Sequence, residues 1–421
     1  MDYRNKLDFN SAPSRIIHMD LNSCFATIEQ QANPLLRGRP VAVAAYKTPN
    51  GCILASSVEA KKYGVKTGMR VKDGKTLCPG LIILDPDPWK YRNVHLSLRK
   101  IVSSYTNDFS PKSIDEFVLN MSDTLHLFGG DMHRVAKEIK KRIKAEVGEW
   151  LTVSVGIAPN RFLAKVASNL QKPDGLSEIN QGNFLGVYKN LRLTDLPYIK
   201  FRNALRLGSI GIQSVVDFYK SPIWKLKAAF ESINGYYWFM RLRGFEVDGV
   251  EFGRRSYGNS YALPNPFDKL ETLAPVLLKL TEKMGFRLRS AGLAARGIHL
   301  AVSYRDGYFW HKGVSFPENL FDSREIFKKA FGVLKLSPFR KPVRDISVSC
   351  FDLRKKNFLQ LAIFEDIQKK EKLVSSIDKI NKFWGDFVLV PARMLFLDKG
   401  AVPDRIAFGG VKELEEFTLQ K

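Results

Sequence analysis

Three carboxylates at expected strand ends constrain the fold of this chain more than any other feature. A short apolar stretch, Ile16-Ile17-His18-Met19, runs directly into Asp20, and far downstream Asp115 and Glu116 stand next to each other. Neighbouring residues in a regular strand point to opposite faces of a sheet. The adjacent pair can therefore serve one site only at a strand end, a bulge or a bend, and the fold must bring Asp20 to it.

The residue types at these positions predict a site for hard divalent cations. Mg²⁺ prefers near-octahedral oxygen coordination and keeps waters or substrate phosphates as ligands. Two such ions about 3.5–4 Å apart stabilise both the attacking and the leaving oxygen of an in-line phosphoryl transfer. An adjacent Asp-Glu pair is also common on solvated surfaces, so the spacing alone leaves both interpretations open.

The overall charge favours phosphate chemistry. The chain has 66 Lys and Arg residues against 43 Asp and Glu residues, a formal net charge of +23, and the basic residues are spread over almost every segment. Ribosomal, heparin-binding and membrane-surface proteins are also basic. A basic chain with an acidic centre nevertheless fits a polyanionic substrate and metal-dependent phosphate chemistry.

Length and composition predict a globular protein of about two to four domains. With 45% hydrophobic residues the chain is not of the disordered class. The polar N-terminal segment and the lack of a run of about eighteen apolar residues predict neither a secretory signal nor a membrane span. The cysteines are scattered, which argues against a zinc site and for a reduced compartment; they are Cys24, Cys52, Cys78 and Cys350.

Interleaved strand and helix patterns predict an α+β arrangement in the first half of the chain. The expected strands are 14–20, 40–45, 52–56, 81–84, two within 109–121, and 151–157, and the expected helices are 22–32, 57–63, 89–106 and 131–147. Residues 178–246 are helical and basic in pattern. A second α+β unit is expected from a helix at 268–290, strands at 296–305 and 309–314, a helix at 323–335 and a strand at 343–350.

An ordered series of motifs surrounds the carboxylates and resembles the Y-family (translesion) DNA polymerases over roughly residues 15 to 400. The motifs are Met19-Asp20-Leu21-Asn22-Ser23-Cys24-Phe25, Leu36-Arg37-Gly38-Arg39-Pro40, Glu59-Ala60-Lys61-Lys62-Tyr63-Gly64, Val155-Gly156-Ile157-Ala158-Pro159-Asn160-Arg161 and Gln171-Lys172-Pro173-Asp174-Gly175. The core motifs resemble the DinB (DNA polymerase IV) branch. Asn50-Gly51-Cys52 and the tail resemble the UmuC branch.

The resemblance implies a right-hand polymerase fold with an additional α+β domain. The implied parts are a palm (1–32 and 86–177), short fingers (33–85), a helical thumb (178–246), a linker (247–258), a little finger (259–352) and a C-terminal tail (353–421). It also implies a low-fidelity, DNA-templated DNA polymerase of translesion synthesis and DNA repair, without a proofreading exonuclease. Two Mg²⁺ ions would be held by Asp20, Asp115, Glu116 and the main-chain carbonyl of Leu21, for nucleotidyl transfer from a dNTP to a primer 3′-hydroxyl.

By the same resemblance, the nucleotide is bound by residues in or next to the first, third and last of these motifs. Phe25 matches the steric gate that excludes a ribose 2′-hydroxyl, and Lys61 and Lys172 match triphosphate contacts. Relatives often have Arg at the Lys61 position, which would be bidentate where Lys is a point charge. Val58 stands where a Tyr is common, and Ser56 or Ser57 could partly replace its hydroxyl. The nucleotide-binding set is Cys24, Phe25, Ser57, Val58, Lys61 and Lys172.

The expected macromolecular partners are primer–template DNA and the bacterial sliding clamp. Family members often have Gly-Ile-Gly in the thumb, where this chain has Tyr198-Ile199-Lys200, so Lys200 and Arg202 are expected to supply phosphate contacts instead. In the second unit the candidates are Arg254, Arg255, Arg289, Arg296, Lys312, Arg340 and Arg344. A clamp-binding-like peptide at 360–364 comprises Gln360, Leu361, Ile363 and Phe364. A monomer in the cytoplasm is expected.

Three other functions are compatible with parts of the pattern. A non-catalytic Y-family relative could act as a clamp-bound adaptor in a mutasome, but such relatives typically lose the metal ligands. A two-metal nuclease would share the carboxylates but would not need the steric-gate segment or the Lys-Pro-Asp-Gly turn. A basic nucleic-acid-binding scaffold would need none of the ordered motifs.

Overall fold

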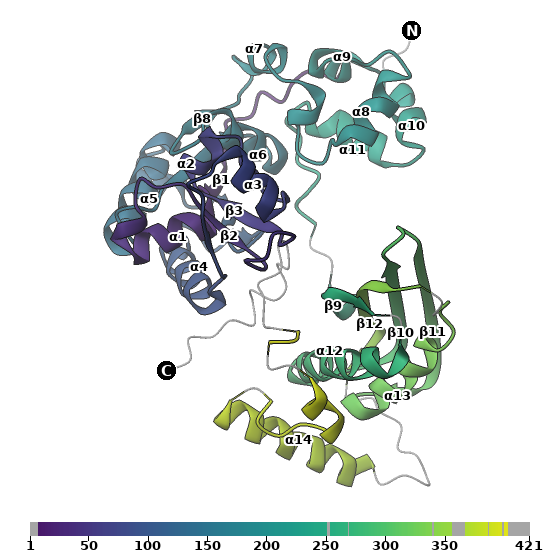
Figure 1. Cartoon of the computed structure of the whole chain (residues 1–421). Coiled ribbons are helices and arrows are strands. Elements are labelled where there is room, and N and C mark those ends of the chain that lie inside the picture. Colours follow the sequence, from purple (N-terminus) through teal and green to yellow (C-terminus); the bar gives the residue numbers. More distant parts are fainter. Residues whose placement is uncertain are drawn as a thin grey trace. The chain divides into compact units, whose positions relative to one another are not determined.

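The computed structural model describes residues 7–250, 253–267, 269–338, 341–355, 367–385, 387–397 and 400–402. The described residues divide into two compact units, one within residues 7–250 and the other within residues 253–402 (Figure 1). Among the described helices, none is both long and apolar enough to cross a membrane.

A five-stranded sheet in the order β5-β6-β1-β7-β8 forms the centre of the first unit. Its strands are β5 (Phe109–Pro111), β6 (Glu116–Asn120), β1 (Ile16–Leu21), β7 (Val153–Ala158) and β8 (Leu176–Glu178). The central strand β1 is antiparallel to both of its neighbours, β6 and β7. In this register Asp20 lies opposite Glu116, and His18 lies opposite Gly156.

Alternate residues of β1 face two different helical layers. Ile17, Met19 and Leu21 belong to a core shared with α1 (Cys24–Ala32), α4 (Pro88–Ser103) and α5 (Met132–Glu146). Ile16 belongs to a second core with α6 (Arg161–Leu170). Because side chains alternate along a strand, His18 and Asp20 share the α6 face with Ile16.

Glycine at position 156 lets α6 pack directly on the sheet. A Cβ atom at Gly156 would lie 2.0 Å from the Ala164 carbonyl oxygen and 2.3 Å from the Ser168 amide nitrogen. Such contacts are far inside van der Waals distance, so any larger residue would push the helix away. The close approach brings Lys165, the neighbour of Ala164, to the strand ends.

The predicted fingers form a small subdomain with its own core. Its sheet has the order β3-β2-β4, with β2 (Val41–Ala44), β3 (Ile53–Ser56) and β4 (Ile82–Leu84), and it carries helices α2 (Val58–Lys62) and α3 (Val71–Leu77). The core is lined by small and β-branched side chains, among them Ala42, Ile53 and Val65.

The predicted thumb consists of short helices that share a core with α6. They are α7 (Phe184–Lys189), α8 (Phe201–Gly208), α9 (Val215–Lys220), α10 (Ile223–Phe230) and α11 (Asn234–Arg241). Asn160 joins the two parts, because its side chain caps α6 and also donates to the carbonyls of Arg241 (3.0 Å) and Phe245 (2.9 Å). The thumb helices are therefore tied to the sheet that carries the carboxylates.

The second unit is a four-stranded antiparallel sheet covered by helices on one face (Figure 1). The strand order is β11-β10-β12-β9, and α12 and α13 pack on the sheet. Its elements are β9 (Ser256–Phe267), α12 (Leu270–Ser290), β10 (Leu293–Tyr304), β11 (Phe309–Leu320), α13 (Ser323–Leu334) and β12 (Val343–Lys355). A further helix, α14 (Ile367–Trp384), and a 3₁₀ turn at Ala392–Phe396 follow.

The α+β class predicted from the sequence is confirmed, with two differences at the domain boundaries. Strand β9 begins at Ser256, so the end of the predicted linker 247–258 is part of a strand paired with β12. The sequence hid this strand because Gly258, Asn259 and Ser260 are turn formers, and pairing with β12 overrides that preference. Strand β12 also runs past the predicted tail boundary at 353. Arg340 and the clamp-like peptide 360–364 lie outside the described residues.

Candidate active site

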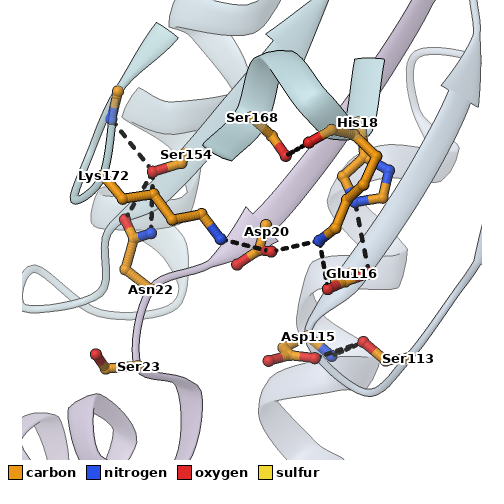
Figure 2. Close-up of polar contacts among 12 residues, drawn as sticks. His18, Asp20, Asn22, Ser23, Ser113, Asp115, Glu116, Ser154, Ser168 and Lys172 are labelled. Carbon is orange, nitrogen blue, oxygen red and sulfur yellow. Dashed lines mark hydrogen bonds and ion pairs between the residues drawn. The ribbon is translucent and has the colours of Figure 1, made fainter. Parts of the chain in front are cut away.

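Asp20 and Glu116 face each other at the ends of two paired strands. Asp20 lies near the end of β1, Glu116 is the first residue of β6, and the two are register partners (Figure 2). Together with His18 they form a group whose ligand atoms all lie within 4.8 Å of one another. The structure therefore brings two of the three predicted metal ligands into direct proximity.

Asp115 lies at a strand end, as the sequence analysis required if the adjacent acidic pair is to serve one site. It precedes β6, and its carbonyl oxygen accepts a hydrogen bond from the Leu21 amide at 2.9 Å. Its carboxylate accepts a hydrogen bond from the Ser113 hydroxyl at 2.5 Å (Figure 2). Burial, with a smaller contribution from the charges of Asp20 and Glu116, raises the pKa of Asp115 to about 6. Asp115 is thus electrostatically coupled to the other carboxylates without belonging to their tight group.

Two lysines balance the negative charge of this group. Lys165 Nζ lies 2.8 Å from Asp20 Oδ2 and 2.6 Å from Glu116 Oε1, and Lys172 Nζ lies 2.8 Å from Asp20 Oδ2. The sequence analysis assigned Lys172 to the site but gave Lys165 no role. The surrounding residues could have indicated a role for Lys165, because it interrupts a run of buried residues on α6. A lysine in such a position needs a partner of opposite charge.

The protonation states follow from burial and from Lys165. Burial lowers the pKa of His18, so its imidazole is neutral, and in the described part of the chain neither ring nitrogen has a hydrogen-bond partner. Burial opposes ionisation of Glu116, but the neighbouring His18 and Lys165 outweigh it and lower the pKa of Glu116. Since His18 Nε2 is 3.5 Å from the Glu116 carboxylate and neutral, we attribute the ionised state mainly to Lys165.

Lys61 and Lys172 both lie near the Asp20 strand end. Lys61, on α2, donates to the Ser23 hydroxyl at 2.8 Å. Burial and then the positive charge of Lys172 lower the pKa of Lys61, so the two ammonium groups are electrostatic neighbours. Two cations that repel each other in this way form a favourable place for a bound anion.

Asn22 positions the turn that carries Lys172. Its side-chain oxygen accepts hydrogen bonds from the Asp174 amide (2.8 Å) and the Thr152 hydroxyl (3.1 Å), and its Nδ2 donates to Ser154 Oγ (2.9 Å). Figure 2 shows Asn22 beside Ser154 below this turn. The sequence analysis missed Asn22, because only the fold brings residue 22 next to residue 174.

Phe25 and Cys24 are buried at the start of α1. The Phe25 ring stacks on Tyr91, with ring centroids 4.3 Å apart and planes 13° from parallel. Burial, followed by the charges of Asp115 and Asp20, raises the pKa of the Cys24 thiol well above its usual value, so the thiol stays protonated. Phe25 is thus packed in the core at the start of α1, five residues after Asp20 near the end of β1.

The prediction that a serine replaces the missing hydroxyl at Val58 is wrong. Ser57 is fully buried and caps α2, where its oxygen accepts from the amides of Ala60 (3.2 Å) and Val41 (3.1 Å). Ser56 is equally buried and donates to the Val65 carbonyl. These hydrogen bonds turn both hydroxyls toward the main chain of the fingers.

The side chains predicted to contact DNA differ in their exposure and in their contacts with other protein groups. Lys200, at the N-cap of α8, and Arg202, within α8, are exposed, and Arg255 is exposed before β9. Lys312 on β11 is also exposed. Three further candidates make protein contacts: the Arg254 guanidinium lies over the Tyr257 ring (3.9 Å), Arg296 donates to Asn319 (3.2 Å) and Arg344 pairs with Asp345 (2.7 Å). Arg289 is not a phosphate contact in this structure, because its side chain is buried in a bidentate ion pair with Asp378 of α14.

Comparison with known proteins decides the family. A profile of the impB/mucB/samB family matches residues 19–169, and a profile of the C-terminal domain of that family matches residues 254–363. The chain is 32% identical to the DNA polymerase IV of Pelotomaculum thermopropionicum (90% of this chain, 94% of the relative) and 31% identical to DNA polymerase IV 1 of Bacillus subtilis (88% and 91%).

The chain belongs to the Y-family DNA polymerases. It is a DNA-directed DNA polymerase of the translesion class, and its similarity to DNA polymerase IV confirms the DinB-like resemblance of the core motifs. A solved Y-family chimera of Dbh and Dpo4 superposes with a TM-score of 0.71 at 24% identity, covering 81% of this chain and 99% of the chimera. In this Y-family polymerase, the strand ends that carry Asp20 and Glu116 lie within the first matched segment.

Replacing Lys165 tests its role in this polymerase. We expect Lys165→Met to lower the free energy of unfolding by about 1–3 kcal/mol in EDTA, because Asp20 and Glu116 then face each other without their shared cation. Added Mg²⁺ or Mn²⁺ should raise the thermal midpoint of this variant more than that of the wild type, as measured by calorimetry.

The control is Lys144→Met, since Lys144 also pairs with an aspartate (Asp174, 2.8 Å) but has a side chain that is 44% exposed. Exposed pairs contribute at most about 1 kcal/mol. Equal losses in the two variants would contradict a central role for Lys165.

Proposed function

We propose that this polymerase transfers a nucleotide from a dNTP to a primer 3′-hydroxyl on a DNA template, using two Mg²⁺ ions held by Asp20, Asp115, Glu116 and the Leu21 carbonyl. The observation that carries the proposal is the pairing of Asp20 with Glu116 at adjacent strand ends, with Asp115 one residue away. DNA polymerase IV relatives and a solved "insertion ternary complex" of the polymerase Dbh support DNA and nucleotide as partners.

The residues present fit hard divalent cations. Three carboxylates and a main-chain carbonyl are oxygen donors, which Mg²⁺ prefers. When bound, the ions would lower the pKa of the primer hydroxyl and neutralise charge on the triphosphate. Asp115 would exchange its Ser113 hydrogen bond for this shared site, and His18 lies against Glu116 on the same face, with Nε2 3.5 Å from the carboxylate.

The lysines of the site suit the triphosphate. Lys61 reaches in from the fingers and Lys172 from the palm turn that Asn22 holds. Lys172 would exchange Asp20 for a phosphate oxygen, so that a preorganised cation faces the charge that develops during transfer. Cys24, Phe25 and Val58 would line the nucleotide on the side of α1 and α2.

We also propose how the polymerase acts in the cell and which macromolecules it binds, as the sequence implies. The polymerase would act with low fidelity and without proofreading, as a monomer in the cytoplasm. Lys200, Arg202, Arg254, Arg255, Arg296 and Arg344 would contact the phosphates of primer–template DNA, and Gln360, Leu361, Ile363 and Phe364 would dock on the bacterial sliding clamp. The apolar trio would fill a pocket while the glutamine orients the peptide.

The metal-site assignment is tested by primer extension on undamaged template with Mg²⁺ and four dNTPs. Asp115→Ala/Glu116→Ala should lose all detectable extension while still binding primer–template, because the change removes metal ligands and leaves the basic surface intact. Asp123→Ala, an exposed acid close to β6, is the control and should extend normally. A wild type that binds primer–template but does not extend it would favour the adaptor function.

The steric gate is tested by sugar selection. Phe25→Ala should raise the ratio of ribonucleotide to deoxynucleotide incorporation by at least about tenfold, a change of about 1.4 kcal/mol in selectivity, while deoxynucleotides are still incorporated. Phe128→Ala removes a ring packed against the same core, away from the site, and should leave the ratio unchanged. An unchanged ratio in single-nucleotide assays of Phe25→Ala would refute the gate.

The clamp proposal has a separate readout in product length. Added sliding clamp should lengthen the products of the wild type, because tethering raises the local concentration of the polymerase at the primer. Leu361→Ala/Phe364→Ala should extend normally without clamp and gain nothing when clamp is added. An equal gain for both proteins would place the clamp contact elsewhere.

A further inference from the structure

A fully buried histidine contacts the chain on both sides of the acidic pair but takes no part in the proposed metal site. His95 lies on the buried face of α4 and is 0% exposed. Its Nδ1 lies 2.8 Å from the carbonyl oxygen of Ile114, the residue before Asp115. Its ring stacks on Phe117, the residue after Glu116, with centroids 4.9 Å apart and planes 18° from parallel. One side chain thus contacts the two residues that flank the pair.

The carbonyl of Ile114 depends on this histidine for a hydrogen bond that the sheet does not supply. Ile114 lies in the loop between β5 and β6, outside their paired residues, so strand pairing does not hold its carbonyl. A carbonyl oxygen can only accept, so Nδ1 of His95 carries the proton and donates. Burial lowers the pKa of His95, which keeps the imidazole neutral. His95 therefore fixes the orientation of this peptide group from the core side.

Asp115 is held through the peptide groups on both of its sides. The preceding group accepts from His95 through the Ile114 carbonyl, and its amide donates to the Ser113 hydroxyl at 3.4 Å (Figure 2). The following group accepts from the Leu21 amide through the Asp115 carbonyl at 2.9 Å. Because the two flanking peptide planes define φ and ψ of a residue, these bonds fix the direction in which the Asp115 side chain leaves the main chain.

The direction of this side chain matters for a metal ligand. Mg²⁺ requires near-octahedral geometry with short metal–oxygen distances, so a carboxylate that points elsewhere is a poor ligand. The hydrogen bond from Ser113 to the Asp115 carboxylate would be given up when the carboxylate binds an ion. The two main-chain bonds, from His95 and from Leu21, would remain. They are the contacts that can orient Asp115 in the metal-bound site.

We propose that His95 is a positioning residue for Asp115, acting through the peptide group that joins Ile114 to Asp115. The inference rests on the proposed function, because Asp115 needs a fixed direction only if its carboxylate holds a metal ion. The stacking on Phe117 keeps the imidazole in place, and the hydrogen bond transmits its position to the main chain. Groups that orient a metal ligand without touching the metal typically change its affinity by about 10–100-fold.

Two variants separate the hydrogen bond from the packing of the ring. His95→Phe keeps a ring over Phe117 and removes the donor. His95→Asn removes the ring and keeps a donor, because Asn Nδ2 is as many bonds from the main chain as His Nδ1. We expect His95→Phe to weaken Mn²⁺ binding by about tenfold. His95→Asn should bind Mn²⁺ nearly as the wild type does, although the cavity that it leaves lowers the thermal midpoint more.

Mn²⁺ binding is measured without turnover. The protein is mixed with primer–template whose primer ends in a dideoxynucleotide, together with the next dNTP, and free Mn²⁺ is followed by its electron paramagnetic resonance signal. Thermal midpoints are recorded for the same proteins without metal. If the loss of Mn²⁺ affinity in the two variants follows their loss of thermal stability, His95 has only a structural role and the inference is overturned.

The matched control is Thr106→Val, which removes a buried hydrogen bond at the opposite end of β6. Thr106 is 5% exposed, and its hydroxyl donates to the Asn120 carbonyl at 2.9 Å and accepts from the Asp108 amide at 3.1 Å. This variant should lower the thermal midpoint and leave Mn²⁺ binding unchanged. A loss of Mn²⁺ affinity equal to that of His95→Phe would show that any weakening of β6 disturbs the site, which would overturn the inference.

Asp115→Ala separates this inference from the proposed function. It should weaken Mn²⁺ binding at least as strongly as His95→Phe does. If Asp115→Ala weakens Mn²⁺ binding and His95→Phe does not, the inference fails alone. If Asp115→Ala binds Mn²⁺ as tightly as the wild type, the proposed set of metal ligands is wrong, and the inference fails with it.

Discussion

The contact of one lysine with two carboxylates organises the structure. Lys165 of α6 lies between Asp20 of β1 and Glu116 of β6, 2.8 and 2.6 Å from their oxygens. It reaches them because α6 packs against β7 at Gly156 without an intervening side chain. Two carboxylates at partly buried strand ends would otherwise repel each other, and an uncompensated buried charge is strongly destabilising. The same helix is capped by Asn160, which also donates to the Arg241 carbonyl at the end of α11, so the strand ends that carry the carboxylates and the helices α7 to α11 depend on one packing arrangement.

The charge distribution explains how a strongly basic chain can carry an acidic centre. The net charge of +23 attracts a polyanion over a broad surface. Within the site, Lys165 and Lys172 balance Asp20 and Glu116, and Lys61 stands beside them from the fingers. In the proposed mechanism these side chains change ionic partners during the reaction, which needs little movement of the main chain. Preorganised charge of this kind is the main source of stabilisation in phosphoryl transfer.

Sequence reasoning succeeded where the information was local and failed where it depended on distant neighbours. The α+β class and most strands followed from apolar periodicity, and the acidic pair was correctly expected at a strand end. Strand β9 was hidden by turn-forming residues whose preference is overridden by pairing with β12. Ser57 looked available beside Val58, yet as a helix cap it is fully buried. Arg289 looked like one more surface cation until α14 supplied Asp378 as its partner.

By itself, the sequence determined which chemistry the protein carries, because residue type and order along the chain fix which oxygen donors, cations and apolar faces exist. The sequence alone was enough to identify Asp20, the Asp115-Glu116 pair and the motifs around Lys61 and Lys172. Only the tertiary structure decided which groups meet. The register of β1 with β6 and the hydrogen bonds of Asn22 to residues 152 and 174 join positions more than ninety residues apart, as between residues 20 and 116. The approach of α6 at Gly156 then brings Lys165 to Asp20 and Glu116. Such proximity depends on packing, which no local pattern in the sequence encodes.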